Sequence, residues 1–372
     1  MPAPCLLDPA DSAAAPGLRA WLALQRALCF RPALAVALLG AHGDPERALR
    51  ASGLPPAPAH ALEAALASLR RARACGLPLP SPAYPPRLAR QADPAPLLLV
   101  QGDAGALGAP GVAIVGSRAP TQHGLALARE FAGALARAGL VVISGLARGI
   151  DAAAHTGALD AGGRTVAVQA CGPDRVYPPA HRRLAVRIAS QGALVTEFPP
   201  GTPPRREHFP LRNRLISGLA AALLVVEARE RSGTLVTAGH AAAQGVDVLA
   251  IPGPVGTPAC AGSNRLLRDG AHVALDPEDV LGVLRLGGLR LAPTPPPARA
   301  ATAAAAASEA GAAILAALAQ APAHRDELAR RIALAPETLA LELLELELAG
   351  RVREERDGRL RVVSPLATRE LC

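Results

Sequence analysis

The chain has 372 residues, half of them apolar, which is enough for two or three domains with a sizeable core. Its formal charge of +8 comes entirely from arginine, because none of the 39 basic positions is a lysine, and this excludes a P-loop nucleotide hydrolase, whose phosphate loop needs a lysine. The longest apolar stretch, residues 219–226, is too short to span a bilayer, and the N-terminal residues lack the pattern of an export signal, so we expect a cytoplasmic location and no membrane association.

The arginine excess is concentrated in the middle of the chain. Residues 106–290 carry nineteen arginines against thirteen acidic residues, whereas residues 1–105 carry ten against seven and residues 308–372 carry nine against eleven. An anionic partner is therefore expected to bind the middle region. The six cysteines form no CxxC pair and the nine histidines are scattered singly, so we expect no metal site, no cofactor and no disulfide framework.

Residues 1–80 are predicted to form a small helical domain. Apolar residues recur at helical spacing in residues 18–30 and 61–74, and turn-forming segments separate the two. The segment 76–96 is rich in proline and is predicted to be an extended connector into the next domain.

Residues 81–286 are predicted to form a Rossmann-like α/β domain that includes this connector. Six short β-favouring runs begin at residues 111, 140, 164, 193, 222 and 246, and helical segments alternate with them. This alternation indicates a doubly wound, mainly parallel sheet with helices on both faces. Such a fold binds its ligands at the carboxyl ends of the strands.

Residues 287–307 are predicted to be a flexible linker, and residues 308–372 a winged helix. The last domain shows three helical segments, at 312–320, 325–332 and 336–350, and then a hairpin that turns at Asp357 and Gly358. The third helix carries four glutamates and no arginine, so phosphate should repel it. We therefore expect this domain to bind protein or to regulate, and not to read a major groove of DNA.

The loops that follow the first two strands of the α/β domain combine hydroxyl groups, glycines and arginines. In "VGSRAP", Ser117 and Arg118 precede a helix start, which is consistent with an anion site or with an ordinary tight turn. "ISGLARGID" repeats the arrangement with Ser144, Gly145 and Arg148. Because consecutive strands of such a sheet are usually neighbours, Arg118 and Arg148 should share one rim.

The segment "RREHFPLRNR", residues 205–214, places four arginines beside one of only four phenylalanines in a chain that is 2% aromatic. Arginine suits backbone phosphates, Phe209 offers a ring on which any base can stack, and Asn213 can read or orient a base edge. The alternative is a solvated turn with Phe209 packed inward.

Four further residues have structural as well as functional interpretations. Asp151 is expected to cap the helix that it begins. Ser232, in "EARERSGTLVTAGHA", fits a phosphate-facing loop or an N-cap equally well. Tyr177 is expected to be a core aromatic with a polar tip, and Arg182 just beyond it could reach the rim.

Motifs for catalysis are missing from the sequence. There is no GxGxxG after the first strand, no GxSxG elbow and no HExxH. "PGPVGTPAC", residues 252–260, is close to the PGGxGTxxE signature of the Rossmann-like phosphoribohydrolases that activate cytokinins, but Cys260 stands where their catalytic glutamate would be. A nucleotide-processing enzyme of that type is one alternative. A winged-helix regulator whose α/β domain senses a nucleotide is another, although it would need a basic recognition helix.

Taken together, the motifs resemble the DprA/Smf family, the DNA-processing protein A of bacterial natural transformation. "VGSR", "SGLARGIDAAAH", "YPPAHRRL", "LVTEFPPGTPP", "HFPLRNRLISGL", "VVEARERSGTLVTA" and "AIPGP" occur in that family's order and spacing. The two flanking domains also look like those of the family. The resemblance implies a cytoplasmic homodimer that binds single-stranded DNA, protects incoming DNA and loads the recombinase RecA onto it, without established catalysis.

The resemblance also implies a DNA-binding pocket. On matching positions it would comprise Ser117, Arg118, Ser144, Gly145, Arg148, Phe209, Arg212, Asn213 and Arg214. Additional contacts would come from Arg182, Arg205, Arg206 and Ser232. The sequence departs from the family at Val246, where a basic residue is frequent, and at "CFRP", which replaces a glycine-rich helix-hairpin-helix turn and leaves the N-terminal domain without that DNA-binding motif.

Overall fold

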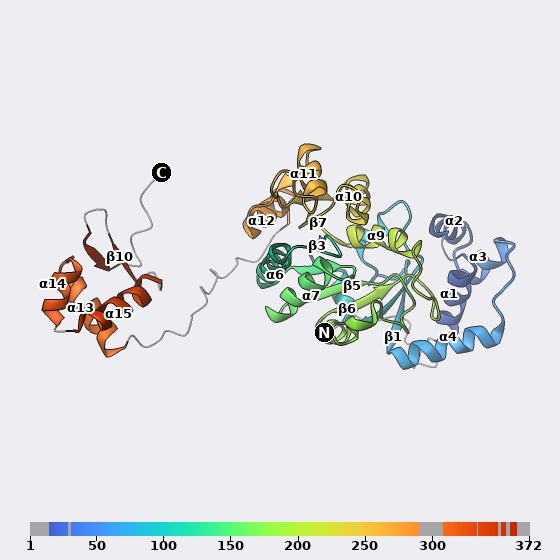
Figure 1. Cartoon of the computed structure of the whole chain (residues 1–372). Helices are drawn as coiled ribbons and strands as arrows, with labels where there is room; N and C mark the ends of the chain where they lie inside the picture. The colour runs from blue at the N-terminus through green and yellow to red at the C-terminus, as the bar shows by residue number, and fades with distance from the viewer. Residues whose placement is uncertain are drawn as a thin grey trace. The chain divides into compact units, whose positions relative to one another are not determined.

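The computed structural model describes residues 15–28, 31–289, 308–332, 334–348, 351–354 and 358–362. The residues up to 289 form one compact unit, and those from 308 onward form a second (Figure 1). The predicted linker lies almost entirely outside the described residues.

Four helices precede the sheet: α1 (Ala15–Ala27), α2 (Pro32–His42), α3 (Pro45–Ala51) and α4 (Ala59–Ala72). Their apolar faces bury a core around Trp21, Leu22 and Leu66, and this core extends onto Leu97 and Leu99 of the sheet. The helical predictions for α1 and α4 are confirmed, and these helices pack directly on one end of the sheet.

Nine strands form the large sheet, in the order β1-β2-β6-β5-β4-β3-β7-β8-β9. All strands from β3 to β9 run parallel, β2 pairs antiparallel with β6, and β1 pairs antiparallel with β2. The predicted doubly wound, mainly parallel fold is therefore confirmed. The sequence analysis did not predict β1 and β2. The strands are β1 (Ala74–Pro78), β2 (Leu97–Gly102), β3 (Gly111–Val115), β4 (Val141–Ser144), β5 (Thr165–Val168), β6 (Ala193–Thr196), β7 (Ala222–Val225), β8 (Asp247–Ala250) and β9 (His272–Val273).

Helices cover both faces of this sheet (Figure 1). Apolar residues of α6, α7, α8 and α12 pack on one face, and those of α5, α9 and α10 pack on the other. The bounds are α5 (Pro86–Ala89), α6 (Gln122–Arg137), α7 (Ile150–Asp160), α8 (Arg182–Gln191), α9 (His208–Leu219), α10 (Gly233–Ala243), α11 (Ala261–Arg268) and α12 (Pro277–Leu286), with short 3₁₀ helices η1 (Ala104–Leu107) and η2 (Pro179–His181).

The second unit has the helices and the hairpin of a winged helix: α13 (Glu309–Gln320), α14 (Arg325–Ile332), α15 (Pro336–Leu348), β10 (Val352–Glu354) and β11 (Leu360–Val362). It has its own core, which includes Ile314, Leu328 and Leu343. Of the predicted hairpin turn, Gly358 is described, with a φ of +78°, and Asp357 lies outside the described residues.

Among the described residues, none of the helices combines the length and the apolar character that a transmembrane span needs. Cys75 is disulfide-bonded, which the spacing of the cysteines did not predict, whereas Cys171 and Cys260 are free and buried. The described residues contain no cluster of three or more metal-ligating side chains.

Candidate nucleic-acid interface

The topology creates a crevice in the middle of the sheet. From β3 the chain adds β4, β5 and β6 on one side, and it then returns to add β7, β8 and β9 on the other. The loops after β3 and β7 therefore diverge at a topological switch point, where open α/β sheets bind ligands. A groove of ≈ 740 Å³ lies there, and we call it the switch-point groove; its lining includes Ser117, Arg118, Tyr177, Arg206, Phe209, Arg212, Asn213, Arg229, Arg231 and Ser232.

Arg118 and two aromatic rings meet at this groove. The guanidinium carbon of Arg118, which is exposed, lies 4.8 Å from the centroid of the partly buried Phe209 ring. The centroid of the Tyr177 ring lies 5.7 Å from that of Phe209, with the two planes 60° apart. Tyr177 is 45% exposed, so the prediction of a core aromatic is wrong: the loop after β5 carries its ring to the groove and not into the sheet core. The three side chains form a cation–π and aromatic cluster that solvent can reach.

The start of α6 offers less to a ligand than the sequence suggested. Glu227 follows β7 and is buried, and its carboxylate accepts hydrogen bonds from the Thr121 backbone N–H (2.9 Å) and from the Thr121 hydroxyl. Ser117 is also buried, and its hydroxyl accepts a hydrogen bond from the Ala119 N–H (3.1 Å). An internal carboxylate thus occupies the positive end of the helix. The predicted anion site at the helix start is corrected, and Arg118 remains as the group that a ligand can reach.

The loop after β4 lies beside the loop after β3, as predicted, because the two strands pair in parallel. Gly149 has a φ of +82°, and a Cβ there would lie 2.3 Å from the Ser117 carbonyl oxygen, so this close approach requires glycine. Arg148 is exposed in this loop but does not line the switch-point groove. The hydroxyl of Ser144 is buried and donates to the Ile114 carbonyl oxygen (2.7 Å), which corrects the prediction that Ser144 contacts a ligand.

Arg212 lines the groove but is a structural cation, with only 3% of the residue exposed. Its Nη1 donates to the carbonyl oxygens of Gly145 (2.7 Å) and Val168. It also attracts Asp151, whose carboxylate accepts hydrogen bonds from the backbone N–H groups of Gly145 (3.1 Å) and Ala147 (3.3 Å). Burial lowers the pKa of Arg212 to about 10 and raises the pKa of Asp151, and the attraction between them opposes both shifts.

These contacts revise three predictions at once. Arg212 holds the loop after β4 through the Gly145 carbonyl oxygen, and its buried guanidinium is not free to bind a phosphate. Asp151 ties that loop to α7 and makes no hydrogen bond that caps its helix. Gly145 packs directly against the guanidinium of Arg212, and a Cβ at this position would lie 2.6 Å from Nη2 of that arginine.

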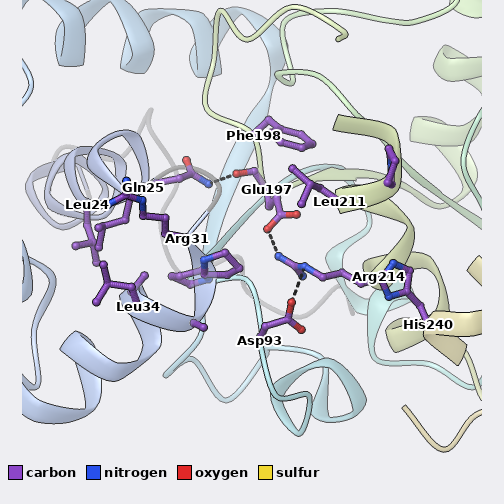
Figure 2. A pocket seen from close by; sticks show the side chains of 16 residues that line it. Leu24, Gln25, Arg31, Leu34, Asp93, Glu197, Phe198, Leu211, Arg214 and His240 are labelled. Atoms are coloured by element: carbon purple, nitrogen blue, oxygen red, sulfur yellow. Dashed lines mark hydrogen bonds and ion pairs between the residues drawn. The ribbon is translucent and has the colours of Figure 1, made fainter. Parts of the chain in front are cut away.

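Arg214 lies outside the switch-point groove, in a pocket of ≈ 630 Å³ between the N-terminal helices and α9. Figure 2 shows its guanidinium between two carboxylates: it pairs with Glu197, and its Nε lies 3.2 Å from Oδ2 of Asp93. Burial raises the pKa of Glu197, and Arg214 opposes this shift. Gln25 of α1 donates to the Glu197 carbonyl oxygen (2.7 Å) and so joins the helical domain to this site. The prediction that Arg214 contacts DNA is therefore corrected to a buried ion pair.

The other predicted contacts divide between the groove and its surroundings. Arg206 is exposed in the groove and Asn213 is half-buried there. Ser232 caps α10 by accepting a hydrogen bond from the Thr234 N–H (3.1 Å). Arg205 and Arg182 line other depressions, and Arg205 lies 4.0 Å from a carboxylate oxygen of Glu207.

Two arginines of the groove were missed by the sequence analysis. Arg229 and Arg231 are exposed in the loop between β7 and α10, and both line the groove. A signal was present, because both follow a strand at the same edge of the sheet as Arg118. With Arg118 and Arg206 they bring four exposed guanidinium groups to one crevice.

The segment that resembles a phosphoribohydrolase signature lacks an exposed reactive group. Cys260 is buried, and burial raises the pKa of its thiol. The side chain of Asn264 clamps Gly253 through two hydrogen bonds, of 3.0 and 2.9 Å. Asn264 thus holds the start of this segment at Gly253, and a buried thiol stands at the position of the signature's glutamate.

Comparison with known proteins agrees with this picture. The family model for DNA recombination-mediator protein A matches residues 77–285, and the model for the DprA winged helix domain matches residues 295–358. The chain is 38% identical to protein Smf of Escherichia coli over 306 residues, which is 82% of each chain.

Two solved structures of DNA processing protein A share the fold. The structure from Streptococcus pneumoniae has a TM-score of 0.62 and 32% identity, and the match covers 70% of this chain and 95% of that one. The structure from Helicobacter pylori, reported for its single-stranded DNA binding mode, has a TM-score of 0.53 and 27% identity and covers 58% and 97% of the two chains. The chain therefore belongs to the DNA recombination-mediator protein A family.

Proposed function

We propose that this protein binds single-stranded DNA in the switch-point groove and acts as a recombination mediator without catalysis. The observation that carries the proposal is the cluster of Arg118, Phe209 and Tyr177 beside three more exposed arginines. Guanidinium groups neutralise backbone phosphates, and rings stack on bases of any identity. This combination suits a flexible single strand whose bases are accessible.

The energies favour exchange of the arginine on Phe209 for a base. An exposed cation–π contact such as that of Arg118 on Phe209 stabilises by about 0.5–1 kcal/mol. Stacking of a base on an aromatic ring is worth about 1–3 kcal/mol. A base can therefore take the place over the ring while Arg118 moves to a phosphate, and no buried contact has to break.

The mediator role extends this binding to partners. The family resemblance supports a cytoplasmic homodimer that protects incoming DNA during natural transformation and loads RecA onto it. Two linked grooves would increase affinity for a long strand through avidity. The buried Cys260 thiol, at the position of the catalytic glutamate in the phosphoribohydrolase signature, argues against that type of enzyme.

The test is a titration of labelled oligo(dT) at several salt concentrations. We expect Arg118→Ala and the double variant Arg229→Ala/Arg231→Ala to weaken binding and to flatten the salt dependence by about 0.7 in log K per log salt for each lost contact. Arg129→Ala is the control, because this exposed arginine of α6 does not line the groove. If affinity survives both groove variants, DNA binds elsewhere. RecA assembly on DNA covered by single-strand-binding protein tests the mediator role separately.

A further inference from the structure

A second groove, of ≈ 1250 Å³, lies next to the switch-point groove. Tyr177 lines both, so the two grooves meet at this ring of the aromatic cluster. The second groove is also lined by the end of α4, in the N-terminal helical domain, and by β2. It therefore joins the α/β domain to a domain for which the sequence suggested no DNA contact.

The second groove is basic along its length. Arg175 and Arg182 line it from the α/β domain, and Arg71 and Arg73 line it from the end of α4. Among the described residues, Asp174 is the single acidic side chain in its lining, and it lies 3.6 Å from Nε of Arg175. The net charge of the lining is thus strongly positive.

Three of these arginines are exposed and have no ion-pair partner among the described residues: Arg71, Arg73 and Arg182. A purely structural role accounts for only part of this. A cation near the C-terminus of a helix stabilises that helix, which fits Arg71 in the last turn of α4 and Arg73 at its C-cap. That role does not explain why Arg182, from α8, lines the same groove.

We propose that single-stranded DNA continues from the switch-point groove, past Tyr177, into this second groove, where Arg71 and Arg73 hold its phosphates. The inference rests on the proposed function of the first groove. Tyr177 is the one aromatic side chain in the described lining, which otherwise offers arginine, proline, aliphatic and small side chains, with Gln101 and Asp174. Contact there is therefore with the backbone of the strand, and it does not depend on sequence.

The experiment compares Arg71→Gln/Arg73→Gln with a matched control, Arg47→Gln/Arg50→Gln, in the full-length protein. The control removes two exposed arginines from α3 of the same domain, at 70% and 69% side-chain exposure, that line neither groove. Both variants are titrated with an oligo(dT) of about 5 nucleotides, which fills one groove, and with one of about 20, which reaches beyond it.

For the long oligonucleotide we expect Arg71→Gln/Arg73→Gln to flatten the salt dependence by about 1.4 in log K per log salt, since single strands give about 0.7 per phosphate contact. Between 50 and 200 mM salt the variant should lose about sevenfold less affinity than the wild type. The short oligonucleotide and the control should behave as wild type. If the long oligonucleotide binds both variants alike while Arg118→Ala still weakens binding, the second groove is not a DNA path. If the wild type binds neither oligonucleotide, the proposed function itself fails.

Discussion

Replacement of Arg212 by alanine should destabilise the fold far more than it changes any DNA contact. The guanidinium is buried, is bonded to the carbonyl oxygens of Gly145 and Val168, and neutralises Asp151. Its pKa is lowered to about 10 by burial, so the protein holds this ion at a net cost. The loss on mutation therefore comes from what stays behind, a buried carboxylate and two carbonyl oxygens without their donor.

Removing one member of a buried ion pair typically costs about 3–5 kcal/mol. Total stabilities of about 5–15 kcal/mol make this a large fraction of the free energy of unfolding. By contrast, Arg118→Ala removes an exposed side chain and a cation–π contact, and should cost at most about 1 kcal/mol. Arg212→Ala should therefore lower the free energy of unfolding much more than Arg118→Ala does, although both arginines were predicted to lie in one pocket.

Urea unfolding monitored by tryptophan fluorescence measures this difference. The chain has a single tryptophan, Trp21, which is buried in the unit that contains Arg212, so the signal reports on the unfolding of that unit. The free energy of unfolding should fall by about 3–5 kcal/mol for Arg212→Ala. If this variant unfolds like the wild type and loses only affinity for oligo(dT), Arg212 contacts DNA and its structural role is refuted.

Four further outcomes are expected. Gly145→Ala should lower the free energy of unfolding by about 1–3 kcal/mol, because the added Cβ meets the guanidinium of Arg212. In an Arg212→Ala background the same substitution should change the free energy of unfolding very little. Equal losses in the two backgrounds of this double-mutant cycle would contradict the prediction. Phe209→Ala should weaken oligo(dT) binding by about 1–3 kcal/mol while the slope of log K against log salt stays unchanged, because the ring contacts a base and not a phosphate. Burial lowers the pKa of His155 to about 3, below its unfolded value of 6.5. The free energy of unfolding should therefore fall as the pH drops from about 6.5 to 3, by up to about 1.4 kcal/mol per pH unit. His155→Gln should reduce this slope when urea unfolding is measured at several pH values. The isolated fragment 308–372 should bind neither single- nor double-stranded DNA in a mobility-shift assay, since four glutamates lie on α15; a retained shift would show that the unit reads DNA after all.

Local patterns were sufficient to predict the central sheet. Strands β3 to β8 are short apolar runs bounded by turn residues, and they alternate with helical segments. The antiparallel addition of β1 and β2 was not readable, because β2 pairs with β6, about a hundred residues later in the chain, and prolines precede it. Pro210 lies in the first turn of α9, where a missing N–H removes no helical hydrogen bond.

The site was predicted as a set of loops but not as a set of contacts. The loops after β3 and β4 are neighbours, as expected from two parallel strands that pair, but Arg148 does not line the groove that Arg118 lines. Which arginines face solvent depends on distant partners: Arg212 bonds to carbonyl groups 67 and 44 residues away, and Arg214 pairs with Asp93 and Glu197. The family motifs assign Arg212 and Arg214 to the same DNA-binding pocket as Arg118. Only the packed structure shows that these two are buried while Arg118 is exposed.

The position of Glu227 explains why this crevice suits a polymer better than a mononucleotide. Many nucleotide-binding α/β folds hold a phosphate with the backbone amides at a helix start beside the switch point. Here a buried carboxylate already accepts the Thr121 N–H at that place, so the fixed anion site is filled from within. The remaining cations, Arg118, Arg206, Arg229 and Arg231, lie on flexible side chains of three separate loops. Such groups do not define a single phosphate position. In the proposed function they contact several phosphates of one strand, each weakly, and Phe209 and Tyr177 receive its bases.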